Sequence, residues 1–147
     1  MGLMADLGDG PVGVDTAIFI YFIEAQPQFL PLLDPLFQSV DLGRREICTS
    51  ALSLLEVLLV PYRAGTRVLA ERYERLLTRS RGVRMIDISH EQLRAAAQLR
   101  AATNVKAPDA LQLSAALSTG CRTFLTNDRR LPEIPSLRVL QLSSYAA

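Results

Sequence analysis

The chain has 147 residues, of which 49% are hydrophobic and 21% are charged. This length and composition predict one compact globular domain and exclude an intrinsically disordered chain. Sixteen basic residues against fifteen acidic ones give a net charge of +1, so overall charge does not indicate a nucleic-acid-binding protein and any basic surface must be local.

Cysteine content and hydropathy bear on the compartment. Cys48 and Cys121 lack the CxxC spacing of metal or redox sites and lie in apolar surroundings, so we expect them to be reduced and buried. The N-terminal sequence has no basic or apolar region of a signal peptide, and no apolar run approaches the ~18 residues of a membrane span. These features predict a cytoplasmic protein without a membrane segment.

In chain order, residues 1–11 are expected to form a polar N-terminal tail, followed by a strand at 12–15 and a helix at 16–26 that ends before Pro27. Helical spacing of apolar residues predicts a helix over 31–42, and the segment REICTS (45–50) predicts a second strand. Ser50 is then expected to cap an apolar helix over 51–60, which Pro61 kinks or ends.

The second half begins with a helix from Thr66 to Arg79, which should pair with the helix over 51–60. Alternation in VRMIDIS (83–89) predicts a strand, and a helix over 89–103 follows, with Ser89 and Gln92 placed as in a capping box. A further helix starts at Pro108 and closes at Gly120.

Two short strands, within 121–128 and 137–142, complete the expected elements, and residues 143–147 are expected to be a C-terminal tail. The alternation of short strands and helices predicts an α/β fold with a mainly parallel sheet covered by helices. In such sheets the functional cleft lies outside the carboxyl ends of the strands. Asp15 and Asp128 both fall at such strand ends.

Three of the four candidate site carboxylates have a structural explanation when each is taken alone. Asp15 could be the N-cap of the helix that follows it. Asp109 stands at a helix start, where a negative charge complements the macrodipole. Asp128 could form an Asx turn.

Glu56 is harder to explain structurally, because it lies in an otherwise apolar helix. A capping box from Ser53 is one alternative, but Ser50 is a better helix start. A buried, unpaired carboxylate costs several kcal/mol, so we expect Glu56 to have an arginine or a metal as its partner.

Together, the four acids could converge on one cleft, where their mutual repulsion would require a divalent cation. Carboxylate oxygens favour Mg²⁺ or Mn²⁺ over zinc, and this combination indicates metal-assisted attack on a phosphodiester. The single histidine, His90, excludes Ser-His-Asp and histidine-rich zinc sites, and no phosphate-binding glycine motif is present.

Four segments in order, VGVDTAIFIYF (12–22), SLLEVL (53–58), KAPDALQLSAAL (106–117) and TFLTNDRRL (123–131), make the chain resemble the PIN-domain family. The resemblance is particularly to the VapC-like toxins of bacterial toxin–antitoxin pairs, and it covers about Val12 to Leu142. It implies a PIN domain over 12–142 with a PIN-like three-layer αβα fold and a mainly parallel central sheet.

The resemblance also implies a metal-dependent endoribonuclease that uses Mg²⁺ or Mn²⁺. Its catalytic and metal-binding acids would be Asp15, Glu56, Asp109 and Asp128. By the same resemblance, the Thr126 hydroxyl and the Asn127 amide would orient a carboxylate or water, with a similar supporting part for Thr16. Arg129 and Arg130, beside Asp128, are candidate RNA phosphate contacts.

The expected partners are an RNA substrate, a cognate antitoxin protein and a second copy of the chain. The homodimer is predicted from the apolar helix over 51–60 and its neighbour over 66–79, as well as from the resemblance. Two alternatives stay open: a non-catalytic module that binds RNA or a partner protein, and a metal-dependent DNA nuclease or phosphatase.

Overall fold

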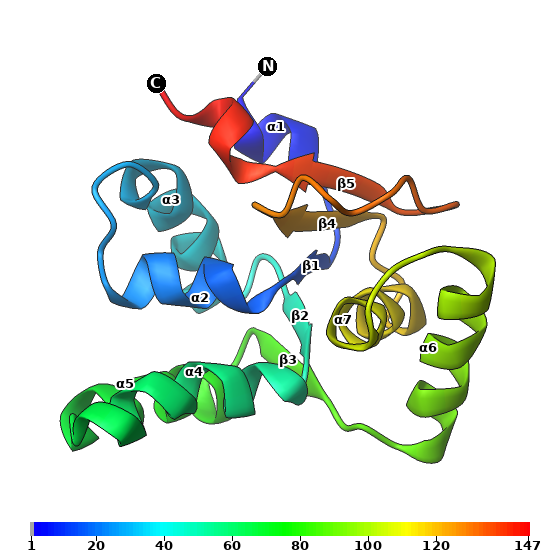
Figure 1. Ribbon diagram of the computed structural model, residues 1–147. Coiled ribbons are helices and arrows are strands. Elements are labelled where there is room, and N and C mark those ends of the chain that lie inside the picture. Colours follow the sequence, from blue (N-terminus) through cyan, green and yellow to red (C-terminus); the bar gives the residue numbers. More distant parts are fainter. Residues whose placement is uncertain (1) are drawn as a thin grey trace.

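A computed structural model describes residues 2–147, which form a five-stranded sheet with helices on both sides (Figure 1). The strands are all parallel, in the order β3-β2-β1-β4-β5. Their bounds are β1 Val12–Val14, β2 Ile47–Ser50, β3 Val83–Ile86, β4 Thr123–Thr126 and β5 Arg138–Gln141. The predicted α/β fold with a mainly parallel sheet is therefore confirmed.

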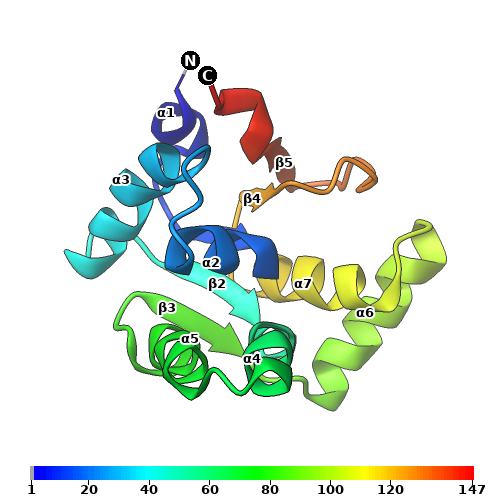
Figure 2. The ribbon, with the colours of Figure 1, turned by 60° about the vertical axis from the view of Figure 1, so that its left-hand side comes forward.

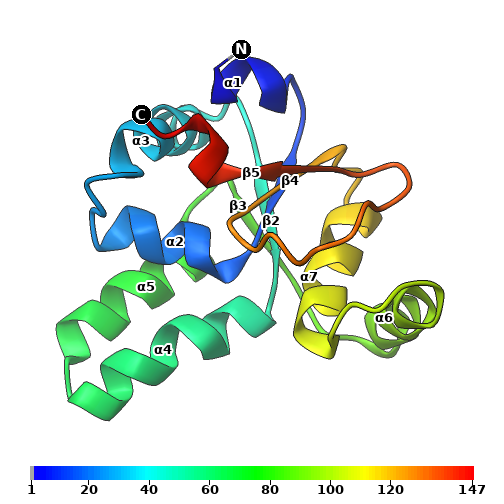
Figure 3. The same cartoon turned by 45° about the horizontal axis from the view of Figure 1, so that its top comes forward.

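The helices form two outer layers, which Figures 1 and 3 show on opposite sides of the sheet. One layer contains α2 (Thr16–Ile23), α3 (Leu30–Asp41), α4 (Leu52–Ala64) and α5 (Arg67–Arg79). The other contains α6 (His90–Ala102) and α7 (Ala107–Ser118). The three-layer αβα arrangement is thus the predicted one, and the predicted pairing of the helices over 51–60 and 66–79 is found in the α4–α5 hairpin.

Helix α7 packs very closely on β1, because Gly13 leaves room for it. A Cβ atom at this position would lie 2.6 Å from the Cβ of Ala116 and 2.9 Å from Cδ1 of Phe124, closer than side-chain carbons approach. The close packing seats the helix that carries Asp109 directly against the strand that leads to Asp15.

Short helices form within residues 2–11 and at 142–145, in and next to the segments predicted as terminal tails. Helix α1 (Leu3–Leu7) buries Leu3 and Leu7, whose spacing of four residues places them on one helix face. The 3₁₀ helix η1 (Leu142–Tyr145) lies near α1, and the Tyr145 hydroxyl donates to Asp6 Oδ2 at 2.6 Å. The two chain ends therefore lie close together (Figure 2).

The boundaries of α4 differ from the predicted ones. The helix continues through the buried Pro61 and ends only at Gly65, which adopts a left-handed conformation with φ of 70°. Ser50 accepts a hydrogen bond from the backbone N–H of Leu52, but the residue at the N-cap position is Ala51. Helix α2 is also shorter than predicted and ends at Ile23.

The predicted capping box of α6 is half formed. The Ser89 hydroxyl accepts from the Gln92 backbone N–H at 3.1 Å. The Gln92 side chain turns away from the cap and donates to Ser118 Oγ at 2.9 Å.

Cys48 and Cys121 are free and buried, as predicted. Of the helices formed by residues 2–147, none combines the length and apolar character needed to cross a membrane.

Candidate active site

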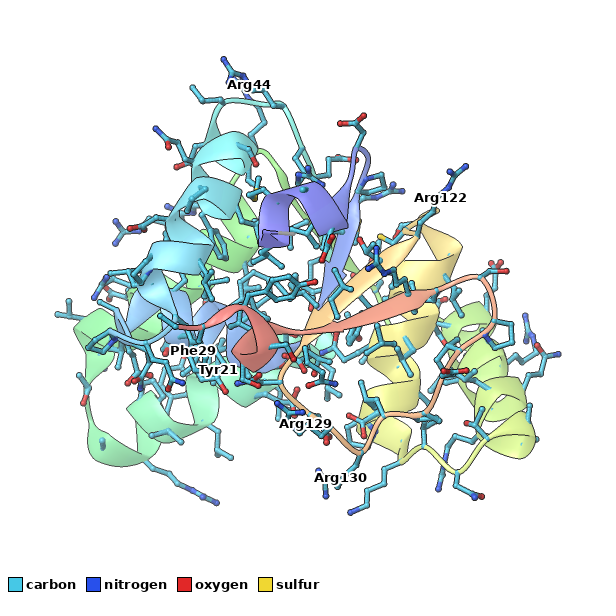
Figure 4. All side chains as sticks on the ribbon, turned by 90° about the horizontal axis from the view of Figure 1, so that it is seen from above. Tyr21, Phe29, Arg44, Arg122, Arg129 and Arg130 are labelled. Atoms are coloured by element: carbon cyan, nitrogen blue, oxygen red, sulfur yellow. The ribbon has the colours of Figure 1, made fainter. Side chains whose placement is uncertain are left out.

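Asp15 and Asp128 follow two adjacent strands at the same edge of the sheet. Strand β1 pairs with β4 in parallel, with Val14 opposite Leu125, and the Asp15 backbone N–H donates to the Leu125 carbonyl at 3.2 Å. In Figure 4, Arg129 and Arg130 lie on the opposite side of the molecule from Arg44 and Arg122, which stand near the strand starts. The carboxyl edge of the sheet therefore carries Asp15, Asp128, Arg129 and Arg130.

Three of the predicted acids line one cleft of about 380 Å³. Asp15 reaches it from the end of β1, Glu56 from α4 and Asp109 from the first turn of α7. Asp128 does not line the cleft, but its charge is close enough to help raise the pKa of Asp109. The other lining residues are Thr16, Ala17, Ile20, Pro108 and Gln112.

A larger hollow of about 630 Å³ lies along the α4–α5 hairpin. Its charged lining consists of three arginines and two glutamates, so it does not gather the carboxylates of a cation site. We assign the site to the smaller cleft, because only there do carboxylates with raised pKa values converge.

Burial raises the pKa of Asp15 from 3.8 to about 6. The hydrogen bond that Thr126 donates to Oδ2 opposes this rise, and the charge of Asp109 adds to it. Asp15 occupies the N-cap position of α2, yet its side chain makes no capping hydrogen bond, and Oδ1 is buried without a partner. The backbone N–H groups of Ala17 and Ile18, at the start of α2, lower the pKa of Asp15, but neither forms a capping hydrogen bond with it, and Oδ1 is available to a ligand.

The pKa of Asp109 is also raised, first by burial and then by the negative charge of Asp128. Glu56 adds to this effect, whereas Arg130 and Lys106 oppose it. The other acids thus repel the charge of Asp109, and a bound cation would relieve this repulsion.

Asp128 combines a structural role with a charged one. Its Oδ1 accepts from the Arg130 backbone N–H at 2.9 Å, so the Asx turn considered for this residue is present. The Arg130 guanidinium also donates to both carboxylate oxygens, from Nε at 3.0 Å and from Nη2 at 3.1 Å. The side-chain hydrogen bond from Arg130 is the main reason that the pKa of Asp128 is lowered.

Glu56 has a hydroxyl partner instead of the predicted arginine. The Thr16 hydroxyl donates to Glu56 Oε1 at 2.6 Å, and no arginine within residues 2–147 forms an ion pair with this carboxylate. The half-buried position of Glu56 at the mouth of the cleft explains why a single hydroxyl suffices, since its other oxygen is not enclosed. Thr16, predicted as a supporting residue, thus contacts a site acid.

Thr126 connects two of the acids. Its hydroxyl donates to Asp15 Oδ2 and accepts from the Asp128 backbone N–H at 3.0 Å. Because Thr126 is fully buried at the end of β4, it ties the side chain after β1 to the turn after β4.

Replacing Thr126 by valine is expected to raise the pKa of Asp15 further, because the hydroxyl stabilises the ionised carboxylate. A ¹³C titration of the Asp15 carboxyl group in metal-free protein measures the shift. Thr126→Ser retains the hydroxyl and serves as the control. An unchanged pKa in the valine variant would show that this hydrogen bond does not contribute in solution.

Asn127 makes contacts other than the predicted ones. Its Oδ1 accepts from the Ser143 backbone N–H at 2.9 Å, and its Nδ2 donates to the Tyr21 hydroxyl at 3.4 Å. Tyr21 in turn packs against Phe29, with ring centroids 4.6 Å apart (Figure 4). The Asn127 amide therefore connects η1 and α2 by hydrogen bonds, and it does not contact a carboxylate.

Arg129 also contacts η1, because its guanidinium Nη2 donates to Ser143 Oγ at 3.1 Å. Only Arg130 of the two arginines makes a direct contact with a site acid.

Three polar residues in or next to the cleft were not predicted as site residues. Thr49, Ser53 and Gln112 are buried and hydrogen-bond to one another. Ser53 also lies 2.9 Å from the Thr16 hydroxyl. A signal was present in the sequence, since Ser53 and Gln112 interrupt apolar helices where a polar residue needs a buried partner.

The oxygen atoms of the cleft are compatible with a hard divalent cation, but the acids do not form a complete coordination sphere. Among residues 2–147, no three acidic, histidine or cysteine side chains lie close enough to hold one ion. The chemistry of the cleft still fits Mg²⁺ or Mn²⁺, because its titratable groups are carboxylates and one buried oxygen, Asp15 Oδ1, has no other partner.

The sequence matches the PIN domain family over residues 12–137, and the chain belongs to this family. PIN domains are generally nucleases, so the family supports a phosphodiester hydrolase. A search of curated protein sequences finds no match.

Solved structures of low sequence identity share the fold. VapBC2 from Rickettsia felis bound to a promoter DNA fragment has a TM-score of 0.68 and 18% identity, covering 90% of this chain and 98% of that chain. A toxin–antitoxin complex from Klebsiella pneumoniae has a TM-score of 0.64 and 20% identity, covering 86% and 94%. FitAB bound to the IR36 DNA fragment has a TM-score of 0.65 and 20% identity, covering 90% and 95%.

Proposed function

We propose that the protein is a metal-dependent endoribonuclease and the toxin of a toxin–antitoxin pair. The observation that carries this proposal is the convergence of Asp15, Glu56 and Asp109 on one cleft, with a buried oxygen of Asp15 left unpaired and Asp128 nearby. Membership of the PIN domain family supports nuclease activity, and the resemblance to VapC-like toxins supports RNA as the substrate.

The four acids would hold Mg²⁺ or Mn²⁺, which when bound would lower the pKa of a water and neutralise the charge that develops on the scissile phosphate. Asp15 is kept in position by Thr126, and Glu56 by Thr16. Burial of Asp15 keeps bulk water from solvating its carboxylate, so a bound cation would stabilise the ionised form. Arg130, and with it Arg129, would bind phosphate groups of the RNA at the cleft entrance.

The test is to incubate purified protein with Mn²⁺ and, separately, with single-stranded RNA, single-stranded DNA and a phosphomonoester. We expect cleavage of RNA alone, with 5′-phosphate and 3′-hydroxyl ends, and no cleavage after chelation of the metal. Asp109→Asn serves as the inactive control. Cleavage of DNA or of the monoester would favour the alternative phosphohydrolases, and no hydrolysis at all would favour a non-catalytic binding module.

We also propose a cognate antitoxin as the protein partner. The similar structures from Rickettsia felis and Klebsiella pneumoniae are described as a VapBC2 complex and a toxin–antitoxin complex. Two free, buried cysteines are compatible with a reducing compartment. We therefore propose that the toxin and its antitoxin act in the cytoplasm.

An exposed apolar stripe on α4 supports partner binding. Leu55, Leu59 and Tyr62 follow one another at intervals of four and three residues, so they lie on one face of the helix. Their exposed fractions are 63%, 43% and 61%. Because Glu56 neighbours this stripe on the same helix, a protein bound there would lie beside the cleft. We propose that the stripe serves in homodimer formation, in antitoxin binding, or in both.

Replacing Leu55 by glutamate is expected to shift the protein toward monomer or to weaken antitoxin binding at least about tenfold, because a charge would be buried in the interface. Light scattering at tens of micromolar and pull-down of a coexpressed antitoxin measure the two outcomes. Leu42→Glu is the matched control, because Leu42 is similarly exposed, at 58%, but lies at the end of α3. Equal behaviour of both variants would exclude the stripe as an interface.

A further inference from the structure

Gln112 is a buried amide in a helix whose neighbouring positions are apolar. It lies in α7, three residues after Asp109, and only 4% of its surface is exposed. Ala110 and Leu113, on either side, are completely buried. A buried amide without partners costs about 2–7 kcal/mol relative to water, so this position requires compensating hydrogen bonds.

All the hydrogen-bonding positions of the Gln112 amide are used. Its Oε1 accepts from the Ser50 backbone N–H at 3.1 Å and lies 3.0 Å from the Thr49 hydroxyl, whose single hydrogen is shared among this oxygen, Val14 O at 3.2 Å and Ser53 Oγ at 2.8 Å. Its Nε2 donates to Ser53 Oγ at 2.8 Å and to Thr16 Oγ1 at 3.4 Å. Because a backbone N–H can only donate, the oxygen must face β2 and the nitrogen must face α4 and α2. The orientation of the amide is therefore determined.

The hydrogen bond between Thr16 and Glu56 has a defined direction, with which the orientation of the Gln112 amide is compatible. An ionised carboxylate only accepts, so the Thr16 hydroxyl donates in its 2.6 Å contact with Glu56 Oε1. The Thr16 oxygen is then left to accept from Gln112 Nε2 and from Ser53, which lies 2.9 Å away. The amide nitrogen cannot accept a proton, so it does not compete with Glu56 for the Thr16 hydrogen.

We propose that Gln112 is a positioning residue that holds the Glu56 carboxylate at the cleft through Thr16 and Ser53. The inference rests on the proposed function, in which Glu56 is one of the metal-binding acids. Helix α7 then serves two of the acids, since it carries Asp109 itself and fixes Glu56 through Gln112. Residues that hydrogen-bond to metal ligands orient these ligands and reduce the conformational freedom that the ligands lose on binding the metal.

Gln92 offers a matched control for a purely structural role. It is also a buried glutamine, with 8% of its surface exposed, and its Nε2 donates to Ser118 Oγ at 2.9 Å. This bond joins α6 to α7 and involves no residue of the cleft. Gln112→Met and Gln92→Met each remove an amide while keeping the length of the side chain.

The first measurement needs no metal. Three-bond couplings of the Thr16 methyl group report its side-chain rotamer by NMR. We expect a single rotamer in the parent protein and in Gln92→Met, and averaging over rotamers in Gln112→Met. A single Thr16 rotamer in Gln112→Met would overturn the proposal whether or not the protein binds metal.

The second measurement is Mn²⁺ affinity by calorimetry together with the kcat of RNA cleavage, at a temperature where every variant is folded. We expect both to fall about 10-fold or more in Gln112→Met and to stay within about twofold of the parent in Gln92→Met. If Gln112 acts through Thr16, adding Gln112→Met to Thr16→Val should cause no further loss. Additive losses, or equal losses in the two methionine variants, would overturn the positioning role.

Gln112→Glu provides a second variant in case Gln112→Met does not fold. It retains an acceptor for Ser50 and Thr49 but removes the donors to Ser53 and Thr16, so the same averaging of Thr16 and the same losses are expected. A parent protein that binds no Mn²⁺ and cleaves no RNA would refute the proposed function, whereas the Thr16 couplings would still decide the positioning role.

Discussion

Replacing Asp15 by asparagine is expected to abolish RNA cleavage and Mn²⁺ binding while making the metal-free protein more stable. Burial raises the pKa of this carboxyl group from 3.8 to about 6, so above pH 6 the folded protein carries an unfavourable buried charge. A shift of this size corresponds to about 3 kcal/mol. An asparagine whose amide lacks one partner would lose part of this gain, so we expect a net stabilisation on the order of 1 kcal/mol at pH 7.5.

The pH dependence of this effect has a definite sign. Since the folded-state pKa lies above the unfolded one, the folded protein binds more protons between about pH 4 and pH 6, and its stability falls as pH rises through this window. The unfolding free energy of Asp15→Asn minus that of the parent should therefore rise by about 3 kcal/mol across this window, from about −2 kcal/mol near pH 4 to about +1 kcal/mol above about pH 7. Denaturant unfolding across this pH range measures it.

Added Mn²⁺ should reverse the order of stability, because binding to the folded parent stabilises it and the variant has lost a ligand. Asp109→Asn should also weaken Mn²⁺ binding, because it removes one of the three carboxylates that line the cleft. Asp34→Asn, an exposed acid on α3, is the control and should change neither property. Unchanged Mn²⁺ affinity in both cleft variants would reject the proposed metal site.

Replacing Arg130 by alanine is expected to tighten Mn²⁺ binding several-fold and to weaken RNA binding roughly tenfold at low salt. The guanidinium of Arg130 engages both oxygens of Asp128, which a cation would also need, and its positive charge repels a cation at the cleft. With 76% of its side chain exposed, Arg130 is free to leave Asp128 for a phosphate of the RNA. The substitution should therefore raise the affinity for Mn²⁺ and lower the affinity for RNA.

The measurements are calorimetric titration with Mn²⁺ and RNA binding across a salt series, with Ca²⁺ as a non-catalytic ion. Loss of one phosphate contact to a single strand should lower the salt slope by about 0.7. Arg129→Ala is the matched control, because Arg129 bonds to Ser143 and contacts no acid, so its Mn²⁺ affinity should equal that of the parent. Weaker Mn²⁺ binding in Arg130→Ala would show that this arginine supports the site instead of competing for Asp128.

Apart from α1 and η1, the strand and helix order could be predicted from the sequence, as could the parallel sheet and the positions of Asp15, Asp109 and Asp128 at element ends. These features depend on local signals: apolar periodicity, Ser89 at a helix start, and carboxylates directly after apolar strands. Segment boundaries were less predictable. Helix α4 continues through Pro61. Helix α1 forms because Leu3 and Leu7 pack against the core, and the short segment around them has no local signal that predicts this packing.

The partners of the site residues were decided only by the tertiary structure. Asp15 and Thr126 are 111 residues apart, and Thr16 and Gln112 are 96 apart, so their hydrogen bonds exist only once distant elements have packed. For the same reason Asn127 contacts Tyr21 and Ser143, although the family resemblance implied that it would orient a carboxylate or water. The sequence by itself determined which carboxylates stand at the ends of strands and helices, since that depends on local backbone structure. Which groups hold, neutralise or repel those carboxylates depends on the packing of the whole chain, because hydrogen bonds and buried charges act over a few ångströms in space whatever their separation in the sequence.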